Sequence, residues 1–153
     1  MNISDEWYTP KEIISSLGEF DLDPASSPEA FSINQSAKRY YSARENGLQQ
    51  PWEGRIWLNP PYSNPLAQQF LSKMAEHNNG IALVFSKIEA KWFHDIVFRY
   101  ATAVKFLYNR VQFYRPDGTK GMQPRNGSML VAYGRENAMM LLNNTLKGKF
   151  VVL

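Results

Sequence analysis

The sequence feature that most constrains the fold is the tetrapeptide Asn59-Pro60-Pro61-Tyr62, which directly follows the mostly apolar run 55–58. The run predicts a short buried strand, because it is apolar and is bounded by turn-forming residues. Two consecutive prolines cannot continue such a strand, since proline lacks the N–H that a sheet requires. We therefore expect the chain to leave the sheet at a stiff turn, at the strand end where ligands bind in open α/β sheets.

This turn carries the groups that a planar amine requires. The exocyclic amine of a nucleobase is a poor nucleophile because its lone pair is delocalised into the ring. An enzyme that alkylates it must hold both hydrogens and turn the lone pair out of the plane. We expect the Asn59 side-chain oxygen and the Pro60 carbonyl to accept those hydrogens, and Tyr62 to stack on the base. An ordinary Asn-Pro turn is the structural alternative, because a short motif is a hypothesis.

The remaining apolar runs alternate with amphipathic segments, a pattern typical of an α/β sheet with right-handed crossovers. The 153 residues contain no repeat and no long linker, which predicts a single domain over residues 1–153. Residues 25–54 are rich in Ser, Pro, Asn, Gln and Gly and are expected to be mostly loop, with a helical turn or short strand near 37–42. We expect helices at 9–17, 64–78, 89–100 and 137–146, strands at 20–23, 55–59, 80–86, 103–108, 111–114, 128–134 and 150–153, and a polar loop at 115–127.

The first of these helices has a predicted start and stop. Thr9 directly precedes Pro10, and Glu12 follows three residues after Thr9. Threonine at the N-cap, proline at the first helical position and a glutamate at the third form a capping box. We expect the helix to stop at Gly18, where glycine favours a helix end.

Composition excludes several classes of chemistry. The chain has no cysteine, which excludes disulfides, thiolate zinc sites and a cysteine nucleophile. It has two histidines, His77 and His94, so neither a histidine metal site nor a Ser-His-Asp triad is expected. No apolar run reaches the roughly 18 residues of a membrane span, and the N-terminus lacks the features of a signal peptide. We therefore expect a cytoplasmic protein that binds neither a membrane nor a metal.

Charge is distributed unevenly along the chain. Residues 1–30 carry seven acidic side chains and one basic side chain, whereas the rest of the chain carries seven and sixteen. Six bases and one acid lie between Arg99 and Arg125, interleaved with aromatic residues. This composition suits a phosphate backbone and unstacked bases, with a solvated basic surface over core aromatics as the alternative. The side chains expected to contact nucleic acid are Arg110, Arg115, Lys120 and Arg125.

Four segments of the chain, taken in order, form a distinctive set of motifs. The segments are Asp5-Glu6-Trp7-Tyr8-Thr9-Pro10, then Phe20-Asp21-Leu22-Asp23-Pro24-Ala25, then Asn46-Gly47-Leu48 with Trp52, and then Trp57-Leu58-Asn59-Pro60-Pro61-Tyr62-Ser63. With these segments at these spacings, the chain resembles the bacteriophage DNA N6-adenine methyltransferases, the phage Dam-type family. The resemblance is densest over residues 5–63 and continues more loosely through 92–93, 106–113 and 127–134.

The resemblance implies an abbreviated Rossmann-like fold that binds S-adenosyl-L-methionine and transfers its methyl group to adenine N6 in DNA, in a bacterial host cell. It implies that an N-terminal segment lies against the cofactor, and that a carboxylate after the first strand contacts the cofactor's ribose or its methionine ammonium. The residues that it implies are catalytic Asn59, Pro60, Pro61 and Tyr62, and cofactor-binding Tyr8, Thr9, Pro10, Asp21 and Asp23.

Two features depart from the usual methyltransferase pattern. The loop after the first strand reads Asp23-Pro24-Ala25-Ser26-Ser27 and is not rich in glycine, and only 34 residues lie between Pro24 and Asn59. That part of the fold must be abbreviated, and we expect target contacts from residues 109–127 and 34–50. Another planar amine (cytosine N4, an RNA base or a protein glutamine) is an alternative substrate. A non-catalytic DNA- or protein-binding module is the alternative of another class.

Overall fold

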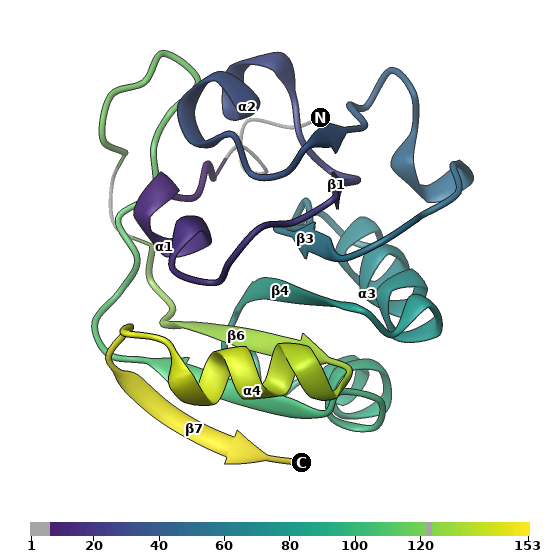
Figure 1. The fold of residues 1–153 in the computed structure, drawn as a ribbon, viewed down its shortest axis with the longest axis vertical. Helices are drawn as coiled ribbons and strands as arrows, with labels where there is room; N and C mark the ends of the chain where they lie inside the picture. Colours follow the sequence, from purple (N-terminus) through teal and green to yellow (C-terminus); the bar gives the residue numbers. More distant parts are fainter. Residues whose placement is uncertain (1–6, 122–123) are drawn as a thin grey trace.

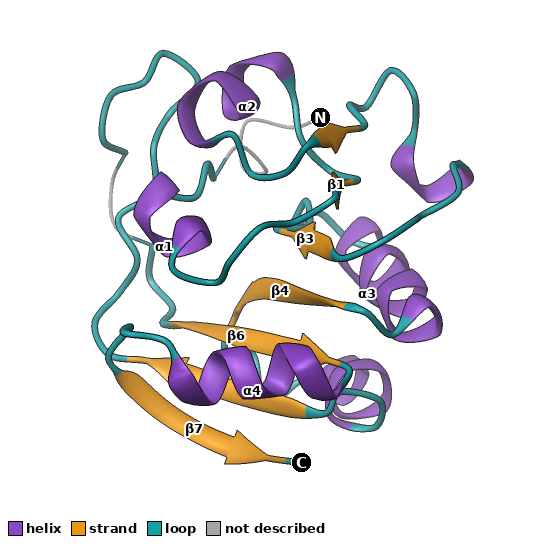
Figure 2. Cartoon of the chain, in the orientation of Figure 1, coloured by secondary structure: helices purple, strands orange, loops and turns teal. Residues whose placement is uncertain are grey.

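The computed structural model describes residues 7–121 and 124–153. Within them, seven strands form one mixed sheet in the order β2-β1-β3-β4-β6-β5-β7, flanked by helices (Figure 1, Figure 2). Asp5 and Glu6 of the N-terminal motif and residues 122–123 of the predicted polar loop lie outside the described residues. The strands are β1 (Leu22–Asp23), β2 (Arg39–Tyr40), β3 (Ile56–Leu58), β4 (Gly80–Phe85), β5 (Ala103–Leu107), β6 (Ser128–Tyr133) and β7 (Gly148–Val152), and the helical segments are α1 (Lys11–Ser15), α2 (Pro28–Asn34), η2 (Gly47–Gln49), α3 (Leu66–His77), η3 (Phe93–Phe98) and α4 (Arg135–Asn143).

The sheet has a parallel half and an antiparallel half that meet at β4. Strands β2, β1, β3 and β4 run parallel to one another. Strand β6 runs antiparallel to β4 and to β5, and β7 runs antiparallel to β5. All six residues of β4 are buried, as expected for a strand covered on both faces. The predicted α/β class is therefore confirmed, as a mixed sheet with helices.

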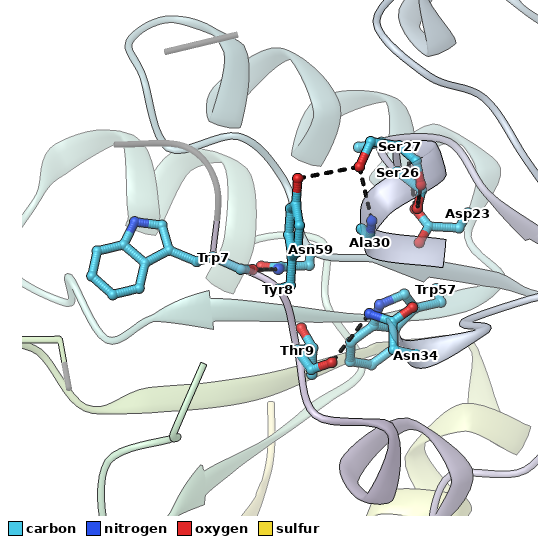
Figure 3. A pocket seen from close by; sticks show the side chains of 11 residues that line it. Trp7, Tyr8, Thr9, Asp23, Ser26, Ser27, Ala30, Asn34, Trp57 and Asn59 are labelled. Carbon is cyan, nitrogen blue, oxygen red and sulfur yellow. Dashed lines mark hydrogen bonds between the residues drawn. The ribbon is translucent and has the colours of Figure 1, made fainter. Parts of the chain in front are cut away.

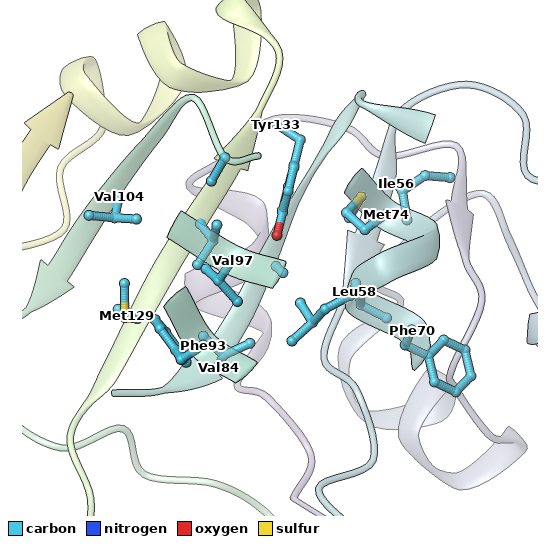
Figure 4. Close-up of a cluster of buried hydrophobic side chains, with 14 of the residues drawn as sticks. Ile56, Leu58, Phe70, Met74, Val84, Phe93, Val97, Val104, Met129 and Tyr133 are labelled. Atoms are coloured by element: carbon cyan, nitrogen blue, oxygen red, sulfur yellow. The ribbon is translucent and has the colours of Figure 1, made fainter. Parts of the chain in front are cut away.

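Each face of the sheet has its own hydrophobic core. Successive residues of a strand face opposite sides, so Ile56 and Leu58 pack on one side and Trp57 packs on the other. The first core joins the sheet to α3 and η3 through Phe70, Met74, Phe93 and Val97 (Figure 4). The second core joins it to α1 and α4 through Ile14, Ala138 and Leu141. The sheet is thus the middle layer of three.

The stretch 25–54, predicted to be mostly loop, contains more structure than expected. Of the two possibilities predicted near 37–42, a helical turn or a short strand, the structure has the short strand, β2. Helix α2 was not predicted: its N-cap is Ser27, whose side chain accepts a hydrogen bond from the Ala30 N–H at 3.0 Å, and Pro28 occupies the first turn. The same Ser/Thr-Pro pattern that we applied to Thr9-Pro10 therefore marks the start of α2.

The capping box predicted at Thr9 is wrong. Helix α1 begins at Lys11 with Pro10 as its N-cap, and no side chain caps it. Thr9 is 1% exposed, and its backbone carbonyl accepts a hydrogen bond from Asn34 at 3.1 Å. The threonine is held by a contact with α2 rather than by its own helix, which the local sequence cannot reveal.

Two further elements differ from prediction. The extended segment expected at 111–114 is not a strand: only Tyr114 pairs, in isolated bridges with Tyr8 and Lys120. The helix expected at 89–100 has a π-helical core, η3. None of the helices among the described residues is long and apolar enough to cross a membrane.

Candidate active site at the carboxyl ends of the parallel strands

The topology places two predicted site residues side by side. Strand β1 lies between β2 and β3, so the chain adds its next strand on one side of β1 and the following strand on the other. Ligands of open α/β sheets bind at such a switch point, outside the carboxyl ends of the strands. Asp23 is the last residue of β1, and Asn59 directly follows β3.

A pocket occupies this switch point (Figure 3). It encloses about 400 Å³ of empty space, part of which is open to solvent. The N-terminal segment, the turn after β1, helix α2 and the end of β3 each contribute to its walls. Its lining residues, which define what we call the polar pocket, are Trp7, Tyr8, Thr9, Asp23, Ala25, Ser26, Ser27, Ala30, Asn34, Trp57 and Asn59.

The amide of Asn59 is oriented by the N-terminal segment. Its Nδ2 donates a hydrogen bond to the Trp7 carbonyl at 2.6 Å. A carbonyl can only accept, so this contact fixes which end of the amide faces the segment and turns Oδ1 away from it. The Tyr62 hydroxyl lies 3.4 Å from Oδ1 but 3.0 Å from the Leu83 carbonyl, the nearer acceptor of its single hydrogen. Oδ1 therefore retains capacity to accept further hydrogen bonds.

The two prolines and Tyr62 form the rigid part of the turn. Pro60 and Pro61 are buried, and Tyr62 is partly buried. The Tyr62 ring stacks on Phe85, with ring centres 4.3 Å apart. Burial raises the pKa of the Tyr62 hydroxyl above its usual value, so it remains protonated at neutral pH. The ring that was expected to stack on a base thus already has Phe85 on one side.

Asp23 is a buried carboxylate in the lining of the polar pocket. It accepts hydrogen bonds from the Ser36 hydroxyl at 2.5 Å and from the Ala25 N–H at 3.1 Å. Burial raises the pKa of Asp23 to about 6, against the lowering effect of these two donors. A positively charged ligand in the pocket would favour the ionised form.

Two residues predicted to bind cofactor do not line the polar pocket. Asp21 precedes β1, where its carboxylate accepts a hydrogen bond from the Arg55 N–H at 2.7 Å and lies 3.7 Å from the Lys38 amine. The Asp21 carboxylate thus connects the amino end of β1 to the residue that precedes β3. Pro10 lies at the start of α1. The structure therefore brings together Tyr8, Thr9, Asp23 and Asn59.

Helix α2 adds pocket residues that the sequence analysis missed, because no helix was expected there. Ser27 donates to the Tyr8 hydroxyl at 3.3 Å. Asn34, the last residue of α2, donates its Nδ2 hydrogen to the Thr9 carbonyl. The Oδ1 of Asn34 and the Oγ1 of Thr9 are both buried without a hydrogen-bond partner. Ser27-Pro28 is the sequence signal that would have indicated this helix.

A second, mainly apolar depression adjoins the polar pocket and shares Ala25 and Ser26 with it. Gly47 permits its shape, because a Cβ at this position would lie 1.9 Å from the Pro24 carbonyl oxygen. The depression encloses about 610 Å³ of empty space, part of it open to solvent. Its lining, which defines the apolar hollow, is Pro24, Ala25, Ser26, Ser42, Ala43, Asn46, Gly47, Leu48, Pro61, Leu66 and Phe70.

The four side chains predicted to contact DNA are exposed and lie in the loop that follows β5. Strands β5 and β4 both run antiparallel to β6, so this loop leaves the sheet at the same end as Asn59. Two backbone hydrogen bonds between Tyr8 and Tyr114, of 3.2 and 2.9 Å, tie the loop to the pocket. No ion pair engages the four side chains within the described residues: Arg110, Arg115, Lys120 and Arg125.

Two other bases of the predicted basic tract do not belong to this surface. Lys105 is 5% exposed, and its amine donates to Asn144 Oδ1. Burial lowers the pKa of Lys105. Arg99 is exposed but precedes β5, so it lies at the opposite end of the sheet. Regarding metals, the described part of the chain contains no cluster of three or more His, Asp or Glu side chains that could hold an ion.

Comparison with known proteins identifies the family. A family model described as DNA N-6-adenine-methyltransferase (Dam) matches residues 1–150. A protein of Escherichia phage T1 named DNA N-6-adenine-methyltransferase is 36% identical over 102 residues, which cover 61% of this chain and 41% of that protein. A protein of Haemophilus phage HP1 with the same name is 30% identical over 140 residues, which cover 84% of this chain and 78% of that protein. No solved structure matches this chain. On the family model and the Haemophilus phage HP1 match, this chain belongs to the DNA N-6-adenine-methyltransferase (Dam) family.

Proposed function

We propose that this protein transfers a methyl group from S-adenosyl-L-methionine to the N6 amine of adenine in DNA. The observation that carries the proposal is the position of Asn59 at the sheet's switch point, with Nδ2 held by the Trp7 carbonyl and Oδ1 left to accept. A side chain oriented in this way is preorganised to accept a hydrogen bond from an amine. The family to which the chain belongs is named for this reaction.

We also propose that the fold is an abbreviated Rossmann-like sheet. Four parallel strands with a switch point beside β1, and helices on both faces, support this assignment. The sheet is abbreviated in the connection that follows β1. Only α2 and β2 lie between β1 and the loop, with η2, that leads to β3.

The residues of the two depressions fit S-adenosyl-L-methionine. The polar pocket offers Tyr8, Thr9 and Asp23 to the amino-acid end of the cofactor, and the unpartnered buried oxygen of Thr9 is the kind of group that a ligand completes. The apolar hollow suits the flat adenosine end, and Ala25 and Ser26 join the two. When bound, the cofactor supplies the electrophilic methyl group.

In the proposed reaction, the protein's task is positioning. The target adenine leaves the base stack, or is met in single-stranded form, at an unstacking cost of a few kcal/mol. Asn59 Oδ1 and the Pro60 carbonyl accept the two N6 hydrogens, which turns the lone pair out of the ring plane and toward the methyl group. Tyr62, supported by Phe85, offers an aromatic surface to the base. The proton leaves to water after transfer, so the reaction needs no strong base.

The exposed loop after β5 is proposed to hold the DNA backbone. Arg110, Arg115, Lys120 and Arg125 are exposed there. The Tyr8–Tyr114 bonds connect this loop to a segment that lines the polar pocket. Phosphate contacts of this kind position the DNA and carry no sequence information.

The test is the identity of the methylated base. DNA from cells that express the protein would be hydrolysed and analysed by mass spectrometry, with cells that express the Asn59→Ala variant as the control. We expect N6-methyladenine with the wild-type protein and background levels with the variant. N4-methylcytosine would contradict the assignment of the base, and unmodified DNA from cells with soluble wild-type protein would contradict the assignment of the reaction. Single-molecule sequencing of the same DNA would locate the methylated positions.

A further inference from the structure

Asn34 lies in the polar pocket with half of its amide unused. The residue is 5% exposed, and its Nδ2 donates to the Thr9 carbonyl at 3.1 Å. Because a carbonyl only accepts, the amide cannot be flipped without losing this bond. Oδ1 therefore points away from the Thr9 carbonyl, as Figure 3 shows, and it has no hydrogen-bond partner.

Thr9, which lines the same pocket, has a second unused group. The residue is 1% exposed, and its Oγ1 has no partner either. Native structures rarely leave a buried polar atom unsatisfied, and each exception calls for an explanation. Here two such atoms belong to residues that line one pocket together with Asp23. A ligand that arrives with hydrogen-bond donors would satisfy both.

The chemistry of these three groups specifies the ligand group. Asn34 Oδ1 and ionised Asp23 can only accept hydrogen bonds, and the Thr9 hydroxyl can accept as well. A carboxylate ligand group brings no donor and would face Asp23 with like charge. A primary ammonium brings three donors and a positive charge, which matches both the acceptors and the carboxylate.

We infer that Asn34 Oδ1 and Thr9 Oγ1 bind the α-ammonium group of S-adenosyl-L-methionine, with Asp23 as the charge partner. This inference rests on the proposed function, because it names the residues that recognise one group of the proposed cofactor. It assigns to α2 a direct binding role: the helix holds Asn34 where its amide both fixes the Thr9 backbone and receives the ligand.

Two ligands that differ in one group test the inference. S-adenosylhomocysteine carries the ammonium, and its analogue with hydrogen in place of the amino group does not; both would be titrated calorimetrically into wild-type, Thr9→Val and Asn34→Ala proteins. We expect each variant to bind S-adenosylhomocysteine about 10- to 100-fold more weakly than wild type does. This is the range for the loss of a hydrogen bond to a charged group. Affinity of the Thr9→Val variant for the deaminated analogue should stay within about threefold of wild type, because the analogue lacks the group that Oγ1 would bind. Ser32→Ala, at an exposed position of the same helix, is the matched control and should change neither affinity.

Thr9→Val separates binding from folding. Valine has nearly the shape of threonine and removes a buried hydroxyl that has no partner, so the free protein should melt at the same or a higher temperature. An equal loss of affinity for both ligands would overturn the inference, because it would place Asn34 and Thr9 against the ribose or in a purely structural role. Unchanged affinity for S-adenosylhomocysteine in both variants would overturn it too. If wild-type protein bound neither ligand, the cofactor assignment itself would fail.

Discussion

The two halves of the sheet differ in how much regular structure they contain. In the parallel half, β1 and β2 have two residues each and β3 has three. In the antiparallel half, β5, β6 and β7 have five or six residues, and they pair along nearly their full length. Short strands leave the chain free to turn early, and the pocket forms where β1 and β3 end. The antiparallel half provides the continuous core that supports those turns.

Both halves bury polar groups, but with different consequences. Lys105, in the antiparallel half, is buried with its amine bonded to Asn144. Tyr133 has a buried hydroxyl without a partner, in the core beside η3 (Figure 4). Thr9 and Asn34 also have unpartnered buried atoms, but these two residues line a pocket. A buried polar atom is therefore informative about function where it adjoins space for a ligand, and much less so inside a packed core.

The largest expected effect is that of Asn59→Ala, which tests the parallel half as the catalytic half. We expect kcat to fall by about 1,000-fold or more, because the variant removes one of the two acceptors that hold the N6 hydrogens. Cofactor affinity should remain close to that of wild type. Single-turnover methylation of DNA and calorimetry with S-adenosylhomocysteine measure the two quantities. Activity within tenfold of wild type would remove Asn59 from the mechanism.

The converse experiment is Leu130→Ala in β6, which tests the antiparallel half as the supporting half. Leu130 is 0% exposed and lies in the core formed with α1 and α4. Its truncation should lower the free energy of unfolding by about 2–5 kcal/mol, through lost burial and a residual cavity. Urea unfolding measures this change. The folded fraction should keep its kcat, and a large loss of kcat at unchanged stability would contradict the division of tasks.

The sequence predicted the parts of the fold that local patterns determine. The apolar run of β4 and the helical spacing of α3 indicated both elements, and the prolines at 60 and 61 indicated where β3 ends. Helix α2 was missed because a seven-residue helix inside a polar stretch has little hydrophobic periodicity. Its start was nevertheless encoded in Ser27-Pro28.

The site was predicted less completely, because it depends on contacts between distant segments. Asp21 and Asp23 stand two positions apart, and no local pattern distinguishes their roles. They differ because β1 begins only at Leu22, so Asp21 meets Arg55 and Lys38 while Asp23 reaches the pocket. Asn34 contacts Thr9, 25 positions away. No pattern in one sequence reports such a contact.

Asp23→Asn tests whether a residue of the parallel half lowers the stability of the fold while it contributes to cofactor binding. Folding raises the pKa of Asp23 from 3.8 to about 6. The native state therefore binds the proton more tightly than the unfolded state, and stability falls as the pH rises from about 4 through 6. The total loss is about 3 kcal/mol. Asparagine cannot ionise, so the variant should gain up to about 3 kcal/mol over wild type at pH 7.5 and only about 0.5 kcal/mol at pH 4.

Urea unfolding of both proteins between pH 4 and pH 8 measures this difference. The same variant should bind S-adenosylhomocysteine more weakly, because it lacks the charge that pairs with the ammonium. A variant that is more stable at neutral pH and also binds less tightly would identify Asp23 as a binding group retained against stability. Equal stability of the two proteins at every pH would contradict the burial of an ionised carboxylate.

The smallest expected effects concern the exposed cations, and they test whether the two ends of the sheet differ. Arg115→Gln and Lys120→Gln each remove one cation from the loop beside the pocket, whereas Arg99→Gln removes one from the opposite end. If the loop holds phosphates, each loop variant should raise KM for DNA a few-fold at constant kcat. It should also lower the slope of log affinity against log salt by about 1, since one fewer counterion is released. Arg99→Gln makes the same change in net charge and should leave the slope as it is. Equal slopes for all three variants would mean that DNA responds to the overall charge of the protein, and the loop would then have no special part in binding.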